Sequence, residues 1–218
     1  MFAPCKLLSS AFFNRDPRRV ARALLGKLLV RKTPGGILAG RIVETEAYLG
    51  EGDAAAHATA GKTARNSVLF GPPGHAYVYF IYGNHYCLNV SCLPDGVPGC
   101  VLFRALEPVA GISKMAQARG VKLSEPELRV LELHEPTDRK KLVCLRKISS
   151  GPGRMTEALA ITRARDNGKS LVSPRSDLQI VDDGYRVRRV LVGPRIGITK
   201  SADHPLRYVI AGNPFVSL

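Results

Sequence analysis

The sequence predicts a single domain, residues 1–218, of the mixed α/β (α+β) class. In this fold helices surround a curved, largely antiparallel β-sheet that carries a protruding β-hairpin. A chain of 218 residues suits one sizeable domain. Its composition, with 45% hydrophobic and 23% charged residues, is ordinary for a globular protein. Strand and helix patterns do not alternate regularly along the chain, which favours a mixed, mainly antiparallel sheet.

Helical segments are predicted from capping residues and from the spacing of apolar positions. Asp16 and Pro17 suit an N-cap and the first helical position, and Gly26 suits the residue that ends that helix. The predicted segments are 17–25, 111–119, 154–161 and part of the charged stretch 121–147.

Strands are predicted from runs of β-branched, aromatic and apolar residues. In chain order they are 28–31, 37–48, 76–82, 85–92, 101–106, 179–181, 188–192 and 208–210. Pro108 is expected to close the strand that begins at Val101. The Gly- and Ala-rich stretch 50–62 is predicted to be a loop.

The charge balance predicts a polyanionic partner. The chain has 32 Lys and Arg against 18 Asp and Glu, a net charge of +14. Nucleic acid is the first partner that such a balance suggests and an anionic membrane is the second. A basic protein that binds neither, or one associated with the ribosome, is the alternative on charge alone. No apolar run approaches the ~20 residues of a membrane span, so no membrane role is expected.

Cysteine and histidine usage predicts neither a disulfide framework nor a metal site. The five cysteines are odd in number and form no CxxC pair, and the five histidines show no HExxH spacing. Reduced, mostly buried thiols are expected, which indicates a cytoplasmic protein, or a nuclear one in a eukaryote. A monomer is the expected state.

The strand 41–48 carries the first candidate for chemistry. Strand alternation places Glu44, Glu46 and Tyr48 on one face. A solvated strand face with ordinary surface charge explains this pattern as well as a functional site does. In a site, a carboxylate beside aromatic groups would suit a general base for water, and alternation does not separate Glu44 from Glu46 in that role.

The hairpin 76–92 carries the second candidate. Tyr77, Tyr79 and Ile81 share one face, where a tyrosine such as Tyr77 is commonly part of a core. Tyr82 immediately precedes the Gly83-Asn84 turn and so lies at the hairpin tip. An aromatic residue at a projecting tip can act as a wedge between stacked bases.

The register of this hairpin is left open by the sequence. A two-residue turn at Gly83-Asn84 would pair Asn89 with Val78. A three-residue loop or a bulge would instead set Asn89 opposite Tyr79.

A Gly-Pro-Gly sequence before Arg154 gives the third candidate. Free N–H groups at a helix start, together with the helix dipole, suit a phosphate group. Arg163 follows nine residues later, about two and a half helical turns, and so is expected on the same side. An ordinary helix start explains the same residues.

Three segments together resemble the alkyladenine (3-methyladenine) DNA glycosylase family, in a bacterial-type member. They are RIVETEAYLGEGDAAAHA (41–58), YVYFIYGNHYCLNVS (77–91) and VLFRALEPVAG (101–111), and weaker similarity extends over most of the chain. The resemblance implies a base-excision repair enzyme that flips damaged purines out of double-stranded DNA. It would hydrolytically remove alkylated or deaminated bases such as 3-methyladenine, 7-methylguanine and hypoxanthine, with no metal or organic cofactor.

The resemblance also implies a catalytic group and a base pocket. Glu46 matches the general base that activates water, Arg104 an arginine that positions that water and contacts the DNA backbone, and Ile196 a residue whose main-chain carbonyl holds the water. The residues that match the base pocket are Tyr48, His57 and Tyr79, as aromatic walls, and Asn89, which would discourage guanine by a clash with its exocyclic amino group. The main-chain N–H of His57 would also read the base edge.

The same resemblance assigns three residues to the duplex. Tyr82 matches the residue that fills the gap left by the flipped base, and Arg154 and Arg163 match basic residues that bind phosphates. If Tyr79 and Asn89 share the pocket, we expect an extra loop residue or a bulge near residues 83–86. A non-catalytic nucleic-acid-binding module of this fold is the main alternative, and hydrolysis of free nucleosides is a third.

Overall fold

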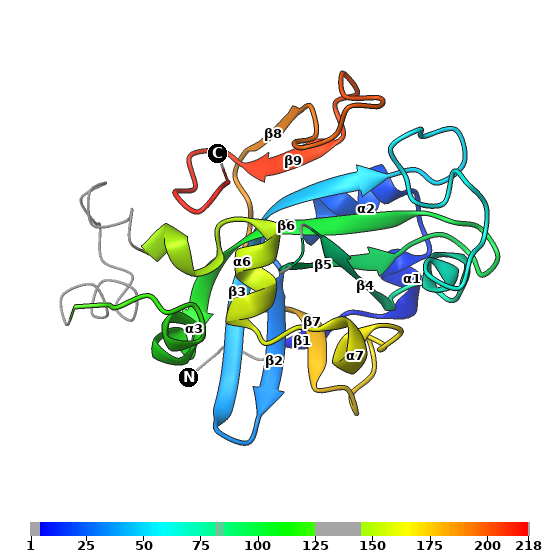
Figure 1. Ribbon diagram of the computed structural model, residues 1–218. Helices are drawn as coiled ribbons and strands as arrows, with labels where there is room; N and C mark the ends of the chain where they lie inside the picture. The colour runs from blue at the N-terminus through cyan, green and yellow to red at the C-terminus, as the bar shows by residue number, and fades with distance from the viewer. Residues whose placement is uncertain (1–4, 82, 84, 125–144, 218) are drawn as a thin grey trace.

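The computed structural model describes residues 5–81, 83, 85–124 and 145–217, and its main feature is one antiparallel sheet (Figure 1). Nine strands of the described residues join this sheet, in the order β1-β7-β2-β3-β6-β5-β4, with β9 pairing with β3 and β8 pairing with β9. The strands are β1 Lys6–Leu7, β2 Leu28–Thr33, β3 Gly36–Tyr48, β4 Ala76–Ile81, β5 His85–Ser91, β6 Cys100–Ala110, β7 Leu178–Asp182, β8 Val190–Gly193 and β9 Arg207–Ile210. Because every pair is antiparallel, the predicted fold class is confirmed.

Short helices cover the sheet. They are α1 Ser10–Phe13, α2 Pro17–Leu24, α3 Ile112–Ala118, α6 Pro152–Ala158 and α7 Arg163–Asp166, with a 3-10 turn, η1, at Ser67–Phe70. In Figure 1, α6 lies in front of the sheet and α2 lies behind it. Val20 and Leu24 of α2 and Met155 of α6 are fully buried in the same core. No helix in the described ranges combines the length and the apolar character that crossing a bilayer requires.

Helix α2 begins as predicted and ends at Leu24, one residue before the predicted end. The carboxylate of Asp16 accepts a hydrogen bond of 2.8 Å from the N–H of Arg18, which satisfies one of the free donors of the first turn. Pro17 occupies the first helical position, where its missing N–H removes no hydrogen bond within the helix. Gly26, two residues past the end, has φ = +85°, a conformation that glycine adopts without strain.

The strand β6 continues past Pro108 to Ala110, so the predicted end at Pro108 is wrong. Pro108 pairs with Gly40 at a register shift between Ala39 and Gly40. Proline is tolerated at such an irregularity because the ladder there does not require its missing N–H.

The hairpin of β4 and β5 has the extra loop residue that was predicted. Ile81 pairs with His85, so residues 82–84 join the two strands. Asn89 pairs with Tyr77 and not with Tyr79, which corrects the expected partner. The reason is that one added loop residue moves the partner of Asn89 by one position, from Val78 to Tyr77. Tyr77 and Tyr79 share a face, so Asn89 still lies on the side that carries Tyr79.

The helix predicted at residues 154–161 ends early and does not continue to Arg163. Helix α6 ends at Ala158, and Ala160 adopts a positive φ of +50°. Thr162 then caps α7 by accepting a hydrogen bond from the N–H of Arg165, so Arg163 begins a separate helix. The helical-turn argument that placed the two arginines on one side is therefore wrong.

Candidate active site

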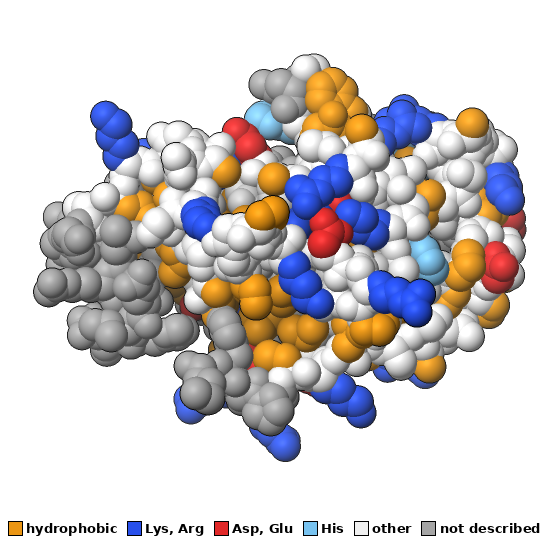
Figure 2. Space-filling model, turned by 90° about the horizontal axis from the view of Figure 1, so that it is seen from below, with side chains coloured by type: hydrophobic (Ala, Val, Ile, Leu, Met, Phe, Trp, Pro, Cys, Tyr) orange, Lys and Arg blue, Asp and Glu red, His pale blue; other side chains and the backbone are white. Residues whose placement is uncertain are grey.

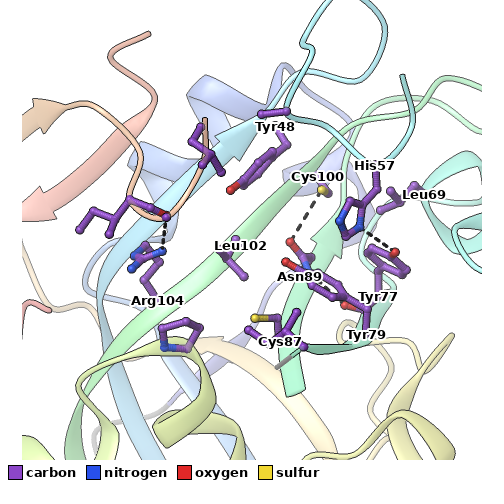
Figure 3. A pocket seen from close by; sticks show the side chains of 16 residues that line it. Tyr48, His57, Leu69, Tyr77, Tyr79, Cys87, Asn89, Cys100, Leu102 and Arg104 are labelled. Carbon is purple, nitrogen blue, oxygen red and sulfur yellow. Dashed lines mark hydrogen bonds between the residues drawn. The ribbon is translucent and has the colours of Figure 1, made fainter. Parts of the chain in front are cut away.

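A cavity of about 300 Å³ opens where the end of β3, the strand β4, the middle of β5, the first half of β6 and two loops meet (Figure 3). The loops are residues 50–59, after β3, and residues 194–206, between β8 and β9, which lie side by side at the top of Figure 1. Six predicted site residues line the cavity: Tyr48, His57, Tyr79, Asn89, Arg104 and Ile196. Its size and its largely apolar lining are those of a small-molecule site.

Aromatic side chains form opposite sides of the cavity. Figure 3 shows Tyr48 on one side and His57, Tyr77 and Tyr79 together on the other. The rings of His57 and Tyr79 meet edge to face, with centroids 4.5 Å apart, and Nδ1 of His57 lies 2.9 Å from the hydroxyl of Tyr77. Tyr77 and Cys100 belong to a small hydrophobic cluster, separate from the main core, against which Tyr48 and Tyr79 pack. Tyr48 and Tyr79, one from each side of the cavity, are therefore packed against buried residues.

Burial and one cationic residue, Arg65, affect the protonation of the His57 side chain. His57 is exposed at the rim, but the protein around its ring lowers the pKa of the imidazole, and the charge of Arg65 lowers it further. Arg65 also lies 6.0 Å from the centroid of the Tyr79 ring. A neutral imidazole at neutral pH suits a wall that stacks on a base.

Asn89 is held in one orientation on the cavity wall. It is 2% exposed, and its Nδ2 donates to the main-chain carbonyl of Tyr77 at 3.3 Å. Its Oδ1 accepts from the thiol of Cys100 at 3.9 Å (Figure 3). Burial raises the pKa of Cys100 to about 12 and that of the neighbouring Cys87 to about 11, so both thiols are protonated at neutral pH. These buried thiols were predicted, but their place in the site was not.

Glu46 lies directly behind the cavity wall and is fully buried. Its Oε1 accepts from the main-chain N–H of Ile196 at 2.8 Å and lies 3.2 Å from Nη1 of Arg104. Its Oε2 accepts from the hydroxyl of Tyr48 at 3.1 Å. All three partners line the cavity, although Glu46 itself is one layer behind them.

The pKa of Glu46 is raised. Burial is the largest cause, and it outweighs the opposing effects of the Arg104 charge and of hydrogen bonds from Ile196 and Tyr48. A carboxylate with a raised pKa binds a proton more readily, which favours the role of a general base.

Glu44 shares this side of β3 but has a different environment. It is also fully buried, so the alternative of a solvated strand face is wrong. Its Oε1 accepts from Nε of Arg207 at 2.6 Å and from Nε of Arg104 at 3.2 Å. Ser217 donates two further hydrogen bonds, from its N–H to Oε2 at 2.7 Å and from its hydroxyl to Oε1 at 2.9 Å. These contacts indicate a structural role for Glu44 and so distinguish it from Glu46. Strand alternation alone could not distinguish the two residues.

Arg104 joins the groups predicted to handle water. Its Nε contacts Glu44, while its Nη1 contacts Glu46 and donates to the carbonyl of Ile196 at 3.4 Å (Figure 3). The structure therefore brings together the three residues that the resemblance assigned to catalysis.

A second, open cavity of about 780 Å³ adjoins the first and shares Ile81, Arg104 and Pro152 with it. The cationic residues that line it, besides Arg104, are Arg119, Arg146, Lys147 and Arg154. Lys and Arg side chains are also spread across the face of the molecule seen in Figure 2, where acidic side chains are few. Arg154 is exposed and lies in this groove, as a phosphate-binding residue would.

The other two residues assigned to the duplex, Arg163 and Tyr82, are not shown to lie in this groove. Arg163 is exposed on α7, next to β4, and lines neither of these two cavities. Tyr82 lies outside the described residues, as does most of the stretch 121–147, so the wedge stays a prediction.

Sequence reasoning missed Arg195 and Asp53. The side chain of Arg195 is fully buried and forms two hydrogen bonds to the carboxylate of Asp53, at 2.6 and 2.8 Å. Its guanidinium also lies 4.6 Å from the centre of the Tyr48 ring. A lone aspartate in the Gly- and Ala-rich loop was the signal that could have indicated a buried partner.

The family model and the similar proteins found by comparison agree with one another. Residues 11–214 match the model of a family described as methylpurine-DNA glycosylase. A protein of Koribacter versatilis is 64% identical over 210 residues, which cover 96% of this chain and 92% of that protein. A protein of Burkholderia cenocepacia is 44% identical over 98% of this chain and 92% of its own length, and one of Methanocella arvoryzae is 44% identical over 97% and 96%. All three are provisionally named 3-methyladenine DNA glycosylase.

Proposed function

This chain belongs to the methylpurine-DNA glycosylase family and is a DNA glycosylase, and we propose that its substrates are alkylated and deaminated purines in double-stranded DNA. It flips such a base out of the duplex and hydrolyses the N-glycosidic bond with a water that Glu46 activates. The observation that carries this proposal is the contact of Glu46 with Arg104 and Ile196 directly behind the wall of an aromatic cavity.

Base flipping is supported by the form of the cavity. Extruding a nucleotide costs a few kcal/mol, and the cost is least for a damaged or mispaired base. Stacking on aromatic walls returns about 1–3 kcal/mol per base. Tyr48 on one side and Tyr79 with His57 on the other provide such walls. The electron-rich faces of the tyrosines add attraction for a purine that carries positive charge through alkylation.

The chemical step uses the carboxylate form of Glu46. The bond between C1′ and the base nitrogen breaks through an oxocarbenium-like state, and its electron pair leaves with the base, which neutralises the charge of an alkylated purine. A neutral base such as hypoxanthine leaves as its anion and takes a proton from solvent. Water forms the new bond to C1′ and gives a proton to Glu46, while Arg104 and the carbonyl of Ile196 orient that water. None of the described residues that line the cavity is a lysine, so strand cleavage through a Schiff base is not part of the proposal.

Base release under single-turnover conditions tests the proposal. Duplexes that contain one hypoxanthine or one 3-methyladenine are incubated with excess protein, beside an undamaged duplex of the same sequence. The proposal expects release of the damaged bases and retention of the normal ones. Tight binding to the damaged duplex without release of any base would instead indicate the non-catalytic binding module.

A further inference from the structure

The buried ion pair of Arg195 and Asp53 joins the two loops that bound the cavity. Asp53 lies four residues before His57, and Arg195 directly precedes Ile196, 142 residues further along the chain than Asp53. Arg195 also donates to the carbonyl of Ala47 at 3.1 Å and to that of Ser201 at 3.3 Å. Burial alone would raise the pKa of Asp53, but hydrogen bonds from Arg195 and from the N–H of Leu49 hold it below its ordinary value. The pair is therefore ionised.

Arg195 covers the Tyr48 ring from behind. Its guanidinium carbon lies 4.6 Å from the ring centroid. Tyr48 lines the cavity, whereas Arg195 is not among the residues that line it. One face of the ring is thus occupied by a protein cation, and the other face is left for the base.

We propose that the Arg195–Asp53 pair sets the preference of the pocket between cationic and neutral purines. This inference rests on the proposed function, because it concerns the base that stacks on Tyr48. A cation on one face of a ring competes for the same π-electrons as a cation on the other face. Arg195 therefore weakens the attraction of Tyr48 for an alkylated, cationic base, and Asp53 partly cancels that effect because it lies next to the guanidinium.

The two partners consequently have opposite effects on selectivity. Arg195→Gln removes the cation and leaves the electron-rich face of Tyr48 free to attract a cationic base. Asp53→Asn removes the anion and leaves the positive charge of Arg195 uncompensated. Loss of a merely structural bridge, in contrast, would slow excision of both kinds of base together, because it would loosen the same two loops.

The test measures second-order, single-turnover rate constants for 3-methyladenine, as the cationic base, and for hypoxanthine, as the neutral one. The ratio of the two is the readout, because a partly folded preparation lowers both rates equally. Arg195→Gln is expected to raise the cationic-to-neutral ratio about threefold or more, and Asp53→Asn to lower it. Arg195→Lys keeps the charge and should stay near the wild-type ratio.

A double variant keeps the proposal testable where a single variant folds poorly. Combining Asp53→Asn with Arg195→Gln replaces the ion pair by a neutral pair of similar shape, and its ratio should lie above that of Asp53→Asn alone. An unchanged ratio in all variants, or a shift in the same direction for both single variants, would overturn the inference. Failure of the wild type to release either base would instead refute the proposed function.

Discussion

At the scale of single residues, the decisive feature is the difference between two buried glutamates on one strand. Both contact Arg104, but Glu44 also receives hydrogen bonds from Arg207 and Ser217, which do not line the aromatic cavity. The other partners of Glu46, Tyr48 and Ile196, do line it. Strand alternation predicted that both carboxylates share a side, and it could not predict which of them is bound only by residues that line the cavity. That distinction depends on partners far away in the sequence, at positions 196, 207 and 217.

The raised pKa of Glu46 predicts the acid side of the pH–rate profile. A general base must be deprotonated, so the rate is full above the pKa of Glu46 and is lost as the pH falls through it. Because burial raises this pKa, the loss should begin above the value of about 4.3 that is ordinary for glutamate. Single-turnover excision of hypoxanthine, measured where circular dichroism shows a folded protein, gives the profile. A rate that is constant down to about pH 4 would contradict this role.

At the scale of elements, local signals in the sequence predicted the start of α2 and most strands, because capping residues and apolar periodicity act within a few residues. Three features were not predicted by these local signals. The break between α6 and α7 depends on the positive φ of Ala160, the extension of β6 on a register shift at Gly40, and the hairpin register on the length of its loop. The last two are decided by how separate segments pair, which the spacing of residue types does not record.

The cap of α2 gives a stability prediction that is independent of activity. Asp16→Ala removes the hydrogen bond to the N–H of Arg18 and should lower the free energy of unfolding by about 1 kcal/mol. Asp16→Ser, which retains a capping oxygen, is the matched control and should lose less. Urea denaturation measures both. Because Asp16 lines neither cavity, excision by the folded protein should not change. Equal stability of Asp16→Ala and the wild type would show that the cap contributes nothing.

At the scale of the whole molecule, the net charge of +14 and the cationic groove beside the cavity agree with DNA as the partner. Composition alone predicted the sign of the partner's charge. It could not locate the groove, because Arg119 and Arg154 come from separate helical regions that only the fold brings together.

This charge distribution predicts a strong dependence of DNA affinity on salt. The logarithm of the association constant should fall linearly with the logarithm of the salt concentration. Arg154→Ala should reduce the slope by about one, because one phosphate contact is lost. Lys32→Ala removes an exposed charge on β2 that lines neither cavity and serves as the control. Fluorescence anisotropy with an undamaged duplex measures both slopes, and identical slopes for the two variants would argue against phosphate binding in the groove.

The central claim, that Glu46 and not Glu44 activates water, is tested most directly by comparing Glu46→Gln with Glu44→Gln. For each variant we would measure the single-turnover rate of hypoxanthine release per folded molecule and the free energy of unfolding. Glu46→Gln should lose about 100-fold or more in rate, because the general base is gone, and should stay folded. Glu44→Gln should mainly lose stability, by roughly 3 kcal/mol, because buried Arg104 and part-buried Arg207 each lose a charged partner. Wild-type rates in Glu46→Gln, or an equal loss of rate in Glu44→Gln, would contradict the account.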